Sequence, residues 1–309
     1  MERKIALIGA GLVGRGWAIV FARAGFQVAL FDGEQRALDE APALIAQSLK
    51  ALAEYGLVED PGAVRSRIRP VQTLVQALEG AEYVQESVFE QVDAKRMIFA
   101  AMDEAVDAKT LIGSSSSGIP ASAFTESLRC RERCLIAHPI NPPYLVPVVE
   151  LVPAPWTAPS AVATVRALMA DTGQVPVVVN REIEGFLINR LQGMLLMEAW
   201  RLVEEGYATV EDVDRTVKDG LGLRWSFMGP FETIDLNAPG GVADYARRLG
   251  PLFQRVAASR AEHRVWSPES ISEVERQRRA ILAESALPER MAWRDRRLMA
   301  VAVHKKAES

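Results

Sequence analysis

The sequence predicts an α/β fold in which an N-terminal doubly wound sheet is followed by an all-α C-terminal domain. Two observations predict it. Short apolar runs alternate with helical patterns from residue 4 to about residue 180, which is typical of a sheet wound by helices. Beyond residue 183 only helical patterns follow. We therefore expect two domains, formed by residues 1–183 and 184–309.

The N-terminal segment has the pattern of a βαβ unit. An apolar run at residues 4–8 predicts a buried strand, apolar residues at helical spacing follow over 15–24, and a second strand is expected at 27–32. A unit of this kind opens a doubly wound sheet. A long helix is then expected over 36–55, with further strands at 81–86, 110–114, 134–138, 146–152 and 175–179.

The C-terminal part has apolar residues at helical spacing. Helices are expected over 185–200, near 210–220 and over 231–249, and the charged stretch 262–297 is expected to be a solvated helical end piece without chemistry. One face of the first of these helices is apolar, which predicts a homodimer formed through the helical domain. The residues of that face are Ile188, Leu191, Leu195 and Ala199.

The composition excludes several classes of protein. A net charge of -4 with scattered cations gives no basic field that would attract nucleic acid or a membrane surface. Cys130 and Cys134 are the only two cysteines, and such a lone C-x-x-x-C pair indicates neither a disulfide framework nor a metal site. No apolar run reaches the roughly 18 residues of a membrane helix, and the first residues lead into a strand and not into a signal peptide. The expected location is the cytoplasm.

A glycine-rich loop joins the first strand to the first helix. Gly9-Ala-Gly11-Leu12-Val13-Gly14 has the G-x-G-x-x-G pattern in the place that dinucleotide binding requires. The first glycine permits a tight turn, the second lets the backbone approach the pyrophosphate, and the third lets helix and strand pack closely. The N–H groups of the helix N-terminus, at Leu12 and Val13, would face the phosphates. The alternative is that the glycines serve only a tight turn.

Asp32 is expected to select between the two nicotinamide dinucleotides. It ends the second strand, at a spacing from Gly14 that suits a carboxylate accepting hydrogen bonds from both ribose hydroxyls and repelling a 2′-phosphate. This position predicts NAD as the cofactor. NADP is the alternative, because Arg36 could pair with that phosphate if it turned inward; a further alternative is that Asp32 merely caps the strand.

His138 is the candidate general base. It ends an apolar strand, where doubly wound folds place their ligands, and an imidazole suits the removal of a hydroxyl proton as hydride leaves the carbon. Glu150 lies in the apolar segment that follows, which predicts a buried carboxylate that fixes the imidazole tautomer. The alternatives are a structural histidine and a glutamate exposed on an edge strand. The other histidines, His263 and His304, lie in polar sequence near the C-terminus.

Three segments resemble the 3-hydroxyacyl-CoA dehydrogenase family. They are AHPINPPYLVPVVELVP at residues 137–153, GFLINR at 185–190 and GPFE at 229–232. The resemblance runs from about residue 4 to about residue 250. It implies a Rossmann domain, a helical domain that dimerises, NAD as cofactor, and a catalytic histidine–glutamate pair assisted by a serine and an asparagine.

The resemblance places these roles on particular residues. The pair falls on His138 and Glu150, the asparagine on Asn189, and the serine on Ser117, which precedes the histidine at the spacing that the family suggests. Serine and asparagine suit hydrogen bonds to the substrate oxygen as it gains carbonyl character. Since residues 114–117 are four serines in a row, a slip by one residue would choose another. As alternatives, Ser117 only caps the next helix and Asn189 only satisfies backbone groups.

Two charged residues match family positions beside the nicotinamide ribose. These are Glu90 and Lys95, in the segment ESVFEQVDAK at residues 86–95. The resemblance therefore implies that both line the cofactor site. From the sequence alone they are typical of the solvated start of a helix.

The charges between residues 33 and 64 bear on the substrate. Relatives that act on acyl-CoA would receive the CoA group near this helical stretch, and its phosphates need cations. Here only Arg36 and Lys50 stand against six acidic residues, which favours a small hydroxy acid without CoA. Arg224 is the candidate that would grip the substrate carboxylate with two hydrogen bonds. The alternative is that Arg224 is a surface charge.

These observations predict an NAD-dependent dehydrogenase that acts on a small hydroxy acid and needs no metal, and the resemblance implies that it oxidises the 3-hydroxyl. The resemblance, with Pro143 and Tyr144 after the histidine motif, implies L-gulonate as substrate and 3-dehydro-L-gulonate as product. Two alternatives stay open. One is a dehydrogenase of short-chain L-3-hydroxyacyl-CoA, and the other, of a different class, is a non-catalytic NAD-binding structural protein.

Overall fold

The computed structural model describes residues 3–260 and 266–308, so His263 lies outside the described residues. The chain divides into two compact units. The first unit comprises Met1–Leu191 and Met291–Ser309, and the second comprises Gln192–Arg290. The domain boundary expected after residue 183 remains a prediction.

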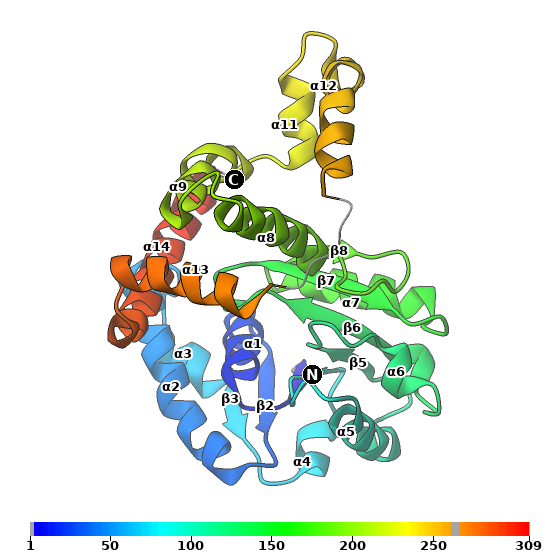
Figure 1. Cartoon of the computed structure of the whole chain (residues 1–309). Helices are drawn as coiled ribbons and strands as arrows, with labels where there is room; N and C mark the ends of the chain where they lie inside the picture. Colours follow the sequence, from blue (N-terminus) through cyan, green and yellow to red (C-terminus); the bar gives the residue numbers. More distant parts are fainter. Residues whose placement is uncertain (1–2, 261–265, 309) are drawn as a thin grey trace. The chain divides into compact units, whose positions relative to one another are not determined.

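An eight-stranded sheet forms the centre of the first unit (Figure 1). Its strand order is β3-β2-β1-β4-β5-β6-β7-β8. Strands β1 to β6 run parallel, β7 runs antiparallel to β6, and β8 runs parallel to β7. The strands are β1 (Lys4–Ile8), β2 (Gln27–Phe31), β3 (Ile68–Pro70), β4 (Tyr83–Glu86), β5 (Leu111–Ser114), β6 (Cys134–Pro139), β7 (Val148–Pro153) and β8 (Val175–Val178).

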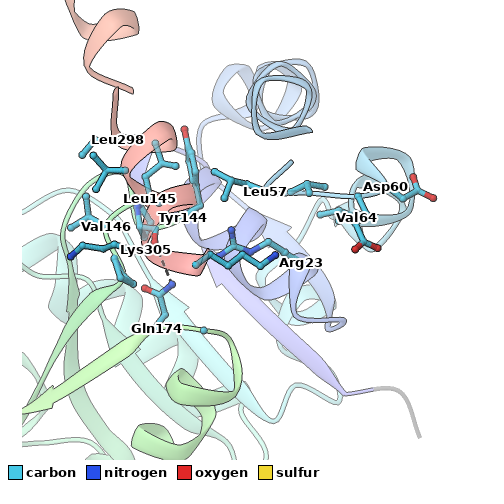
Figure 2. A pocket seen from close by; sticks show the side chains of 18 of the residues that line it. Arg23, Leu57, Asp60, Val64, Tyr144, Leu145, Val146, Gln174, Leu298 and Lys305 are labelled. Carbon is cyan, nitrogen blue, oxygen red and sulfur yellow. Dashed lines mark hydrogen bonds between the residues drawn. The ribbon is translucent and has the colours of Figure 1, made fainter. Parts of the chain in front are cut away.

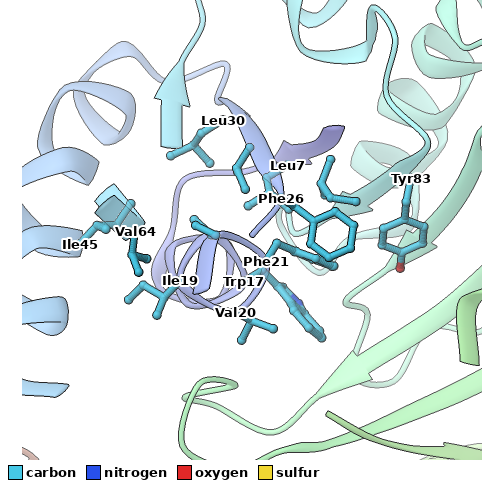
Figure 3. Packing of buried hydrophobic residues seen from close by; sticks show 14 of the residues in the cluster. Leu7, Trp17, Ile19, Val20, Phe21, Phe26, Leu30, Ile45, Val64 and Tyr83 are labelled. Carbon is cyan, nitrogen blue, oxygen red and sulfur yellow. The ribbon is translucent and has the colours of Figure 1, made fainter. Parts of the chain in front are cut away.

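Helices cover both faces of this sheet, which explains why its strands are almost continuously apolar. Ile5 and Leu7 belong to one buried cluster, whereas Ala6 and Ile8 belong to another, as the alternation of side chains along a strand requires. On the first face, the ring centroid of Phe21 lies 5.5 Å from that of Trp17 and 6.0 Å from that of Tyr83, and all three belong to one buried cluster (Figure 3). The helices of this face are α1 (Leu12–Arg23), α2 (Gln35–Glu54), α3 (Pro61–Ser66) and α7 (Pro159–Asp171); those of the other face are α4 (Leu74–Leu78), α5 (Val92–Ala105) and α6 (Ser122–Thr125).

The fold class predicted from the sequence, a doubly wound sheet followed by helices, is confirmed. Two elements differ from expectation. Strand β3 was not predicted, because such a short strand that includes a proline carries no periodicity. The single helix expected over 231–249 is two helices, α11 (Pro230–Leu236) and α12 (Gly241–Ala258). Gly241 breaks the pattern, since its φ of 70° is left-handed.

The last helix, α14 (Leu287–Glu308), extends into the first unit. Met299 is buried in the same cluster as Leu49 and Leu52 of α2, and Leu298 packs against that cluster. The chain directly after the charged stretch therefore contributes to the core of the first unit.

The described part of the second unit is helical. Trp200 and Trp266 stack with ring centroids 4.3 Å apart, and Arg260 pairs with Glu198 and Glu205. Within residues 3–260 and 266–308, no helix combines the length and the apolar character that crossing a membrane requires. The remaining helices are α8 (Ile188–Glu204), α9 (Val210–Arg215), a π-helical turn (Thr216–Leu221), α10 (Gly222–Trp225) and α13 (Pro268–Ile281).

Candidate active site

The glycine loop lies where the order of the strands reverses. The neighbours of β1 are β2 and β4, so the loop between β1 and α1 opens at the switch point of the sheet, where such folds bind their ligands. Gly9 has a φ of 111°, and a Cβ atom there would lie 2.5 Å from the carbonyl oxygen of Ser87. A Cβ atom at Gly14 would overlap the carbonyl oxygen of Gly9. Both positions therefore require glycine.

The middle of the loop is open. A Cβ atom added to Gly11 would meet no described atom within 4 Å, which leaves room for a ligand to approach the backbone. Helix α1 begins at Leu12, and the first N–H groups of a helix have no intrahelical partner. Leu12, Val13 and Gly14 can therefore offer these N–H groups to a phosphate, as the sequence predicts.

Asp32 is fixed beside this loop at the end of β2. One carboxylate oxygen accepts a hydrogen bond from the Ala10 N–H at 2.6 Å, and the other accepts one from the Glu34 N–H at 2.8 Å. Arg36 is engaged in an ion pair with Glu40 at 2.8 Å, and 89% of its side chain is exposed. A carboxylate without a cation next to it suits the ribose hydroxyls of NAD and not the phosphate of NADP.

Lys95 forms a charge cluster with the buried Glu86 and the exposed Glu90. Its Nζ atom lies 3.1 Å from Glu86 and 3.4 Å from Glu90. Burial raises the pKa of Glu86, although the charge of Lys95 and the hydroxyl of Ser114 act in the opposite direction. Since only 1% of Lys95 is exposed, its assignment to the solvated start of a helix is wrong.

Glu90 organises the loop after β5. Its Oε1 atom accepts hydrogen bonds from the Ser116 hydroxyl at 2.7 Å, from the Ser117 N–H at 2.9 Å and from the Gly118 N–H at 3.0 Å. Burial alone would raise the pKa of Glu90, but these hydrogen bonds and the charge of Lys95 lower it. The carboxylate thus holds the serine loop in place, and its contact with a ribose stays a prediction.

The structure distinguishes the four consecutive serines. The hydroxyl of Ser114 donates to Glu86, Ser115 joins a hydrogen-bond network with Trp17, and Ser116 bonds to Glu90. Only Ser117 among the four has an exposed side chain, and its Oγ atom is 3.5 Å from Glu90. Of these serines, Ser117 is therefore best placed to meet a substrate.

Asn189 lies next to Ser117. It is in the first turn of α8, and its side-chain N–H donates to the carbonyl oxygen of Ser117 at 2.5 Å. The two residues that the resemblance assigned to the substrate oxygen are thus brought together. The same contact satisfies a backbone group, as the alternative for Asn189 expected.

His138 and Glu150 form a buried pair. The Nδ1 atom of His138 lies 2.9 Å from Oε2 of Glu150, and the glutamate side chain is fully buried. Strand β8 flanks β7, so the alternative of a glutamate exposed on an edge strand is wrong. Because a carboxylate can only accept a hydrogen bond, Nδ1 carries the proton and Nε2 is left as an acceptor. An imidazole in this tautomer can act as a base.

The other oxygen of Glu150 is held by the start of α8. Oε1 accepts hydrogen bonds from the N–H groups of Leu187 at 2.7 Å and Ile188 at 3.0 Å. Gly185 and Phe186, with φ values of 75° and 49°, are left-handed and turn the chain into this position. A helix N-terminus also favours a negative charge. These two donors were not predicted from the sequence, where the glycine of the GFLINR motif is the one signal of a turn at this place.

The other candidates lie outside this group. Arg224 belongs to α10 in the second unit, is half-buried, and its contact with a substrate stays a prediction. His304 is exposed on α14. Cys130 and Cys134 are buried thiols with their sulfur atoms 3.6 Å apart. No group of metal-binding side chains occurs among the residues that the structure describes.

A cavity of about 1060 Å³ lies beside α3 and α14 in the first unit (Figure 2). Its lining comes from α3, from residues 143–147 and from α14, and includes none of the predicted site residues. Gln174 donates to the carbonyl oxygen of Pro143 at 3.3 Å, while its own buried oxygen has no partner among the described residues. Of this lining, residues 143–147 lie between His138 and Glu150 in the sequence, and they include Pro143 and Tyr144, which follow the histidine motif.

Comparisons with known families agree with the geometry. A model described as the NAD binding domain of 3-hydroxyacyl-CoA dehydrogenase matches residues 4–183. A second model, described as the C-terminal domain of 3-hydroxyacyl-CoA dehydrogenase, matches residues 185–275. Together the two models span most of the chain.

Individual relatives extend the comparison. A lambda-crystallin homolog of Bos taurus is 43% identical over 303 residues, which cover 96% of this chain and 94% of the relative. An L-carnitine dehydrogenase of Streptomyces griseus is 39% identical over 81% of this chain and 74% of its own. Among solved structures, a 5-formyl-3-hydroxy-2-methylpyridine 4-carboxylic acid 5-dehydrogenase superposes with a TM-score of 0.84 at 28% identity, covering 98% of both chains.

Proposed function

Since the chain belongs to the 3-hydroxyacyl-CoA dehydrogenase family and is an NAD-dependent oxidoreductase acting on a secondary alcohol, we propose that it oxidises the 3-hydroxyl of a small hydroxy acid. L-Gulonate is the substrate that we select, with 3-dehydro-L-gulonate as product. The observation that carries the proposal is the His138–Glu150 pair, in which Nδ1 is occupied by the carboxylate and Nε2 is available.

His138 acts as the general base. Its Nε2 atom takes the proton of the substrate hydroxyl, and Glu150 holds the ring in the required tautomer and stabilises the imidazolium that forms. The N–H groups of Leu187 and Ile188 keep Glu150 in place during this change. When bound, NAD accepts the hydride that leaves the hydroxyl-bearing carbon.

Ser117 and Asn189 hold the oxygen of the substrate. As the alcohol becomes a ketone, its oxygen gains negative charge, which hydrogen-bond donors at fixed positions stabilise. The Ser117 hydroxyl and the second N–H of the Asn189 amide are such donors. Their proximity supports this assignment.

Three observations favour an acid without CoA. Arg36, one of only two cations between residues 33 and 64, is already paired with Glu40. The face of α2 that carries Leu49 and Leu52 is buried in one core with Met299 of α14, so this face is covered by protein and is not open to a CoA group. The relatives named above include dehydrogenases of L-carnitine and of a pyridine carboxylic acid, both small carboxylates. The choice of L-gulonate rests on the resemblance of the histidine motif with its Pro143 and Tyr144.

Two rival functions are weighed against this proposal. A 3-hydroxyacyl-CoA dehydrogenase of Gibberella moniliformis is 34% identical over 87% of this chain, which favours a short-chain L-3-hydroxyacyl-CoA as substrate. The other rival is the structural protein that binds NAD without catalysis. Against the structural protein, the base, its carboxylate and both oxygen-binding side chains are all present in this chain.

A comparison of substrates tests the proposal. NADH formation would be measured for the pure protein with NAD and, in parallel, L-gulonate, L-carnitine, 3-hydroxybutyrate and 3-hydroxybutyryl-CoA. We expect the highest kcat/KM for L-gulonate. A higher value for the thioester would instead support the acyl-CoA function, and NADH binding without turnover of any of the four would support the structural protein.

A homodimer formed through the helical region is part of the same proposal. Leu191 and Met194 on α8 are 70% and 72% exposed, and Phe231 on α11 is 79% exposed, which supports a homodimer that covers apolar surface of the helical region. Light scattering after gel filtration would measure the mass of the assembly.

Arg224 is proposed to bind the substrate carboxylate, so Arg224→Lys should raise KM more than it lowers kcat.

A further inference from the structure

Ser87 is the last member of a hydrogen-bond network at the carboxyl ends of β4 and β5. The Tyr83 hydroxyl lies 2.5 Å from Oε1 of Gln85, and Nε2 of Gln85 lies 2.7 Å from the Ser115 hydroxyl. Ser115 in turn lies 2.8 Å from the Ser87 hydroxyl. The indole N–H of Trp17, a residue of the buried cluster in Figure 3, also donates to Ser115, at 3.1 Å. The direction of every hydrogen bond in this network can be deduced.

The orientation of the Gln85 amide fixes the directions of the other hydrogen bonds. The amide atom that faces Ser115 also lies 3.1 Å from the carbonyl oxygen of Ala137, the residue before His138. A carbonyl oxygen can only accept, so the facing atom must be the nitrogen, and the amide cannot be flipped. Gln85 therefore donates to both Ala137 and Ser115, and its oxygen accepts from Tyr83.

Ser115 has only one way left to place its own hydrogen. A hydroxyl oxygen accepts two hydrogen bonds and donates one. The indole N–H of Trp17 and the amide N–H of Gln85 are both donors, so they occupy the two acceptor positions of Ser115. Ser115 must then donate its hydrogen to Ser87.

Ser87 consequently has a hydrogen to donate elsewhere. Its hydroxyl has no acceptor among the described residues, and the side chain is half-buried. It is also next to the cofactor loop, since its Cβ atom lies 3.8 Å from the Cβ position of Gly14 and its carbonyl oxygen contacts Gly9. A donor of fixed direction at this place is suited to an acceptor on a bound dinucleotide.

We propose that Ser87 donates a hydrogen bond to an oxygen on the nicotinamide half of bound NAD. Strand β4 lies on the His138 side of the switch point, whereas Asp32 at the end of β2 marks the adenosine side. Ser87 thus acts on the half of the cofactor that carries the reacting ring. The proposal rests on NAD as the cofactor and is independent of which alcohol is oxidised.

Binding measurements without substrate test the proposal. Isothermal titration calorimetry would give the Kd of NADH and of AMP, which lacks the nicotinamide half, for the wild type, Ser87→Ala and Tyr83→Phe. A net hydrogen bond of about 0.5–1.5 kcal/mol corresponds to a loss of NADH affinity of about two- to tenfold in Ser87→Ala. AMP should bind with unchanged affinity.

Tyr83→Phe is the matched control. It removes one hydroxyl from the same network, but Ala137 still fixes Gln85, so NADH affinity should equal that of the wild type. The proposal would be overturned if Ser87→Ala bound NADH as tightly as the wild type, if AMP lost as much affinity as NADH, or if Tyr83→Phe weakened NADH equally. Failure of L-gulonate as a substrate would leave these binding results unaffected.

Discussion

His138 and Glu150 are directly opposite one another in the antiparallel pair of β6 and β7. Opposite residues of such a pair present their side chains on the same face of the sheet, a few ångströms apart. The reversal of β7 relative to β1–β6 thus brings the carboxylate to the histidine. The chain between the two residues consists of the two strand ends and the connecting loop.

Glu150→Gln should remove most of the activity while the protein stays folded. If the new amide N–H faces His138, Nδ1 must become the acceptor and the proton moves to Nε2, which then cannot act as a base. We expect kcat to fall by about 10²- to 10⁴-fold, the range of general-base catalysis. Steady-state kinetics would measure this fall, and Glu182→Gln is the control, because Glu182 also accepts a backbone N–H, that of Ser122. Equal loss in both variants would contradict the account.

Ser117→Ala should lower activity, whereas Ser116→Ala should lower stability. Ser117 is exposed and proposed to bind the substrate oxygen, so its loss should lower kcat by about 10-fold or more with an unchanged melting temperature. Ser116 is buried and bonds to Glu90 and to the Ile119 carbonyl, so its loss should lower the free energy of unfolding by about 1–3 kcal/mol. Kinetics and thermal unfolding of both variants separate the roles; a stability loss confined to Ser117→Ala would reverse the assignment.

Gly185→Ala should impair both stability and activity. An alanine at a φ of 75° costs about 1–2 kcal/mol, and relief of this strain would shift the N–H groups that hold Glu150. Gly56→Ala is the control, since Gly56 has a φ of 69° and an added Cβ meets nothing within 4 Å. Both variants should lose similar stability in denaturant unfolding, but only Gly185→Ala should lose kcat. Full activity of Gly185→Ala would show that this turn does not position the carboxylate.

Asp32→Ala should weaken the binding of NAD. Two hydrogen bonds from the ribose would be lost, which predicts an increase in Kd of about 10-fold or more. Without the carboxylate, NADP should also be rejected less strongly. Fluorescence titration with NADH and NADPH would measure both effects, and Asp39→Ala, on the exposed side of α2, serves as control. A variant that kept the NADH affinity and the cofactor preference of the wild type would rule out the role of Asp32.

The parts of the site that depend on local sequence could be predicted. The glycine loop, Asp32 and the strand that ends in His138 follow from patterns within short stretches of sequence, where periodicity and turn chemistry act directly. The burial of Glu150 was also predictable, because its neighbours are apolar. The choice among the serines needed the structure, since four identical side chains differ only in what surrounds each of them.

The parts that depend on distant contacts could not be predicted. Nothing near Glu150 indicates that the N–H groups of Leu187 and Ile188 bind it, because α7 and β8 separate them from β7 in the sequence. The left-handed φ of Phe186 is likewise set by tertiary packing, as its buried ring lies 5.7 Å from that of His138. The same holds for the contact between Gln85 and Ala137, which joins two strands that are not neighbours.

The central claim is that His138 removes the proton of the alcohol, and His138→Ala tests it most directly. The decisive measurement pairs kcat for the oxidised hydroxy acid with the Kd of NADH. We predict that kcat falls by about 10²- to 10⁴-fold while NADH affinity stays within about twofold of the wild type. A variant that kept kcat within about tenfold of the wild type, with NADH still bound, would contradict the assignment of His138 as the base.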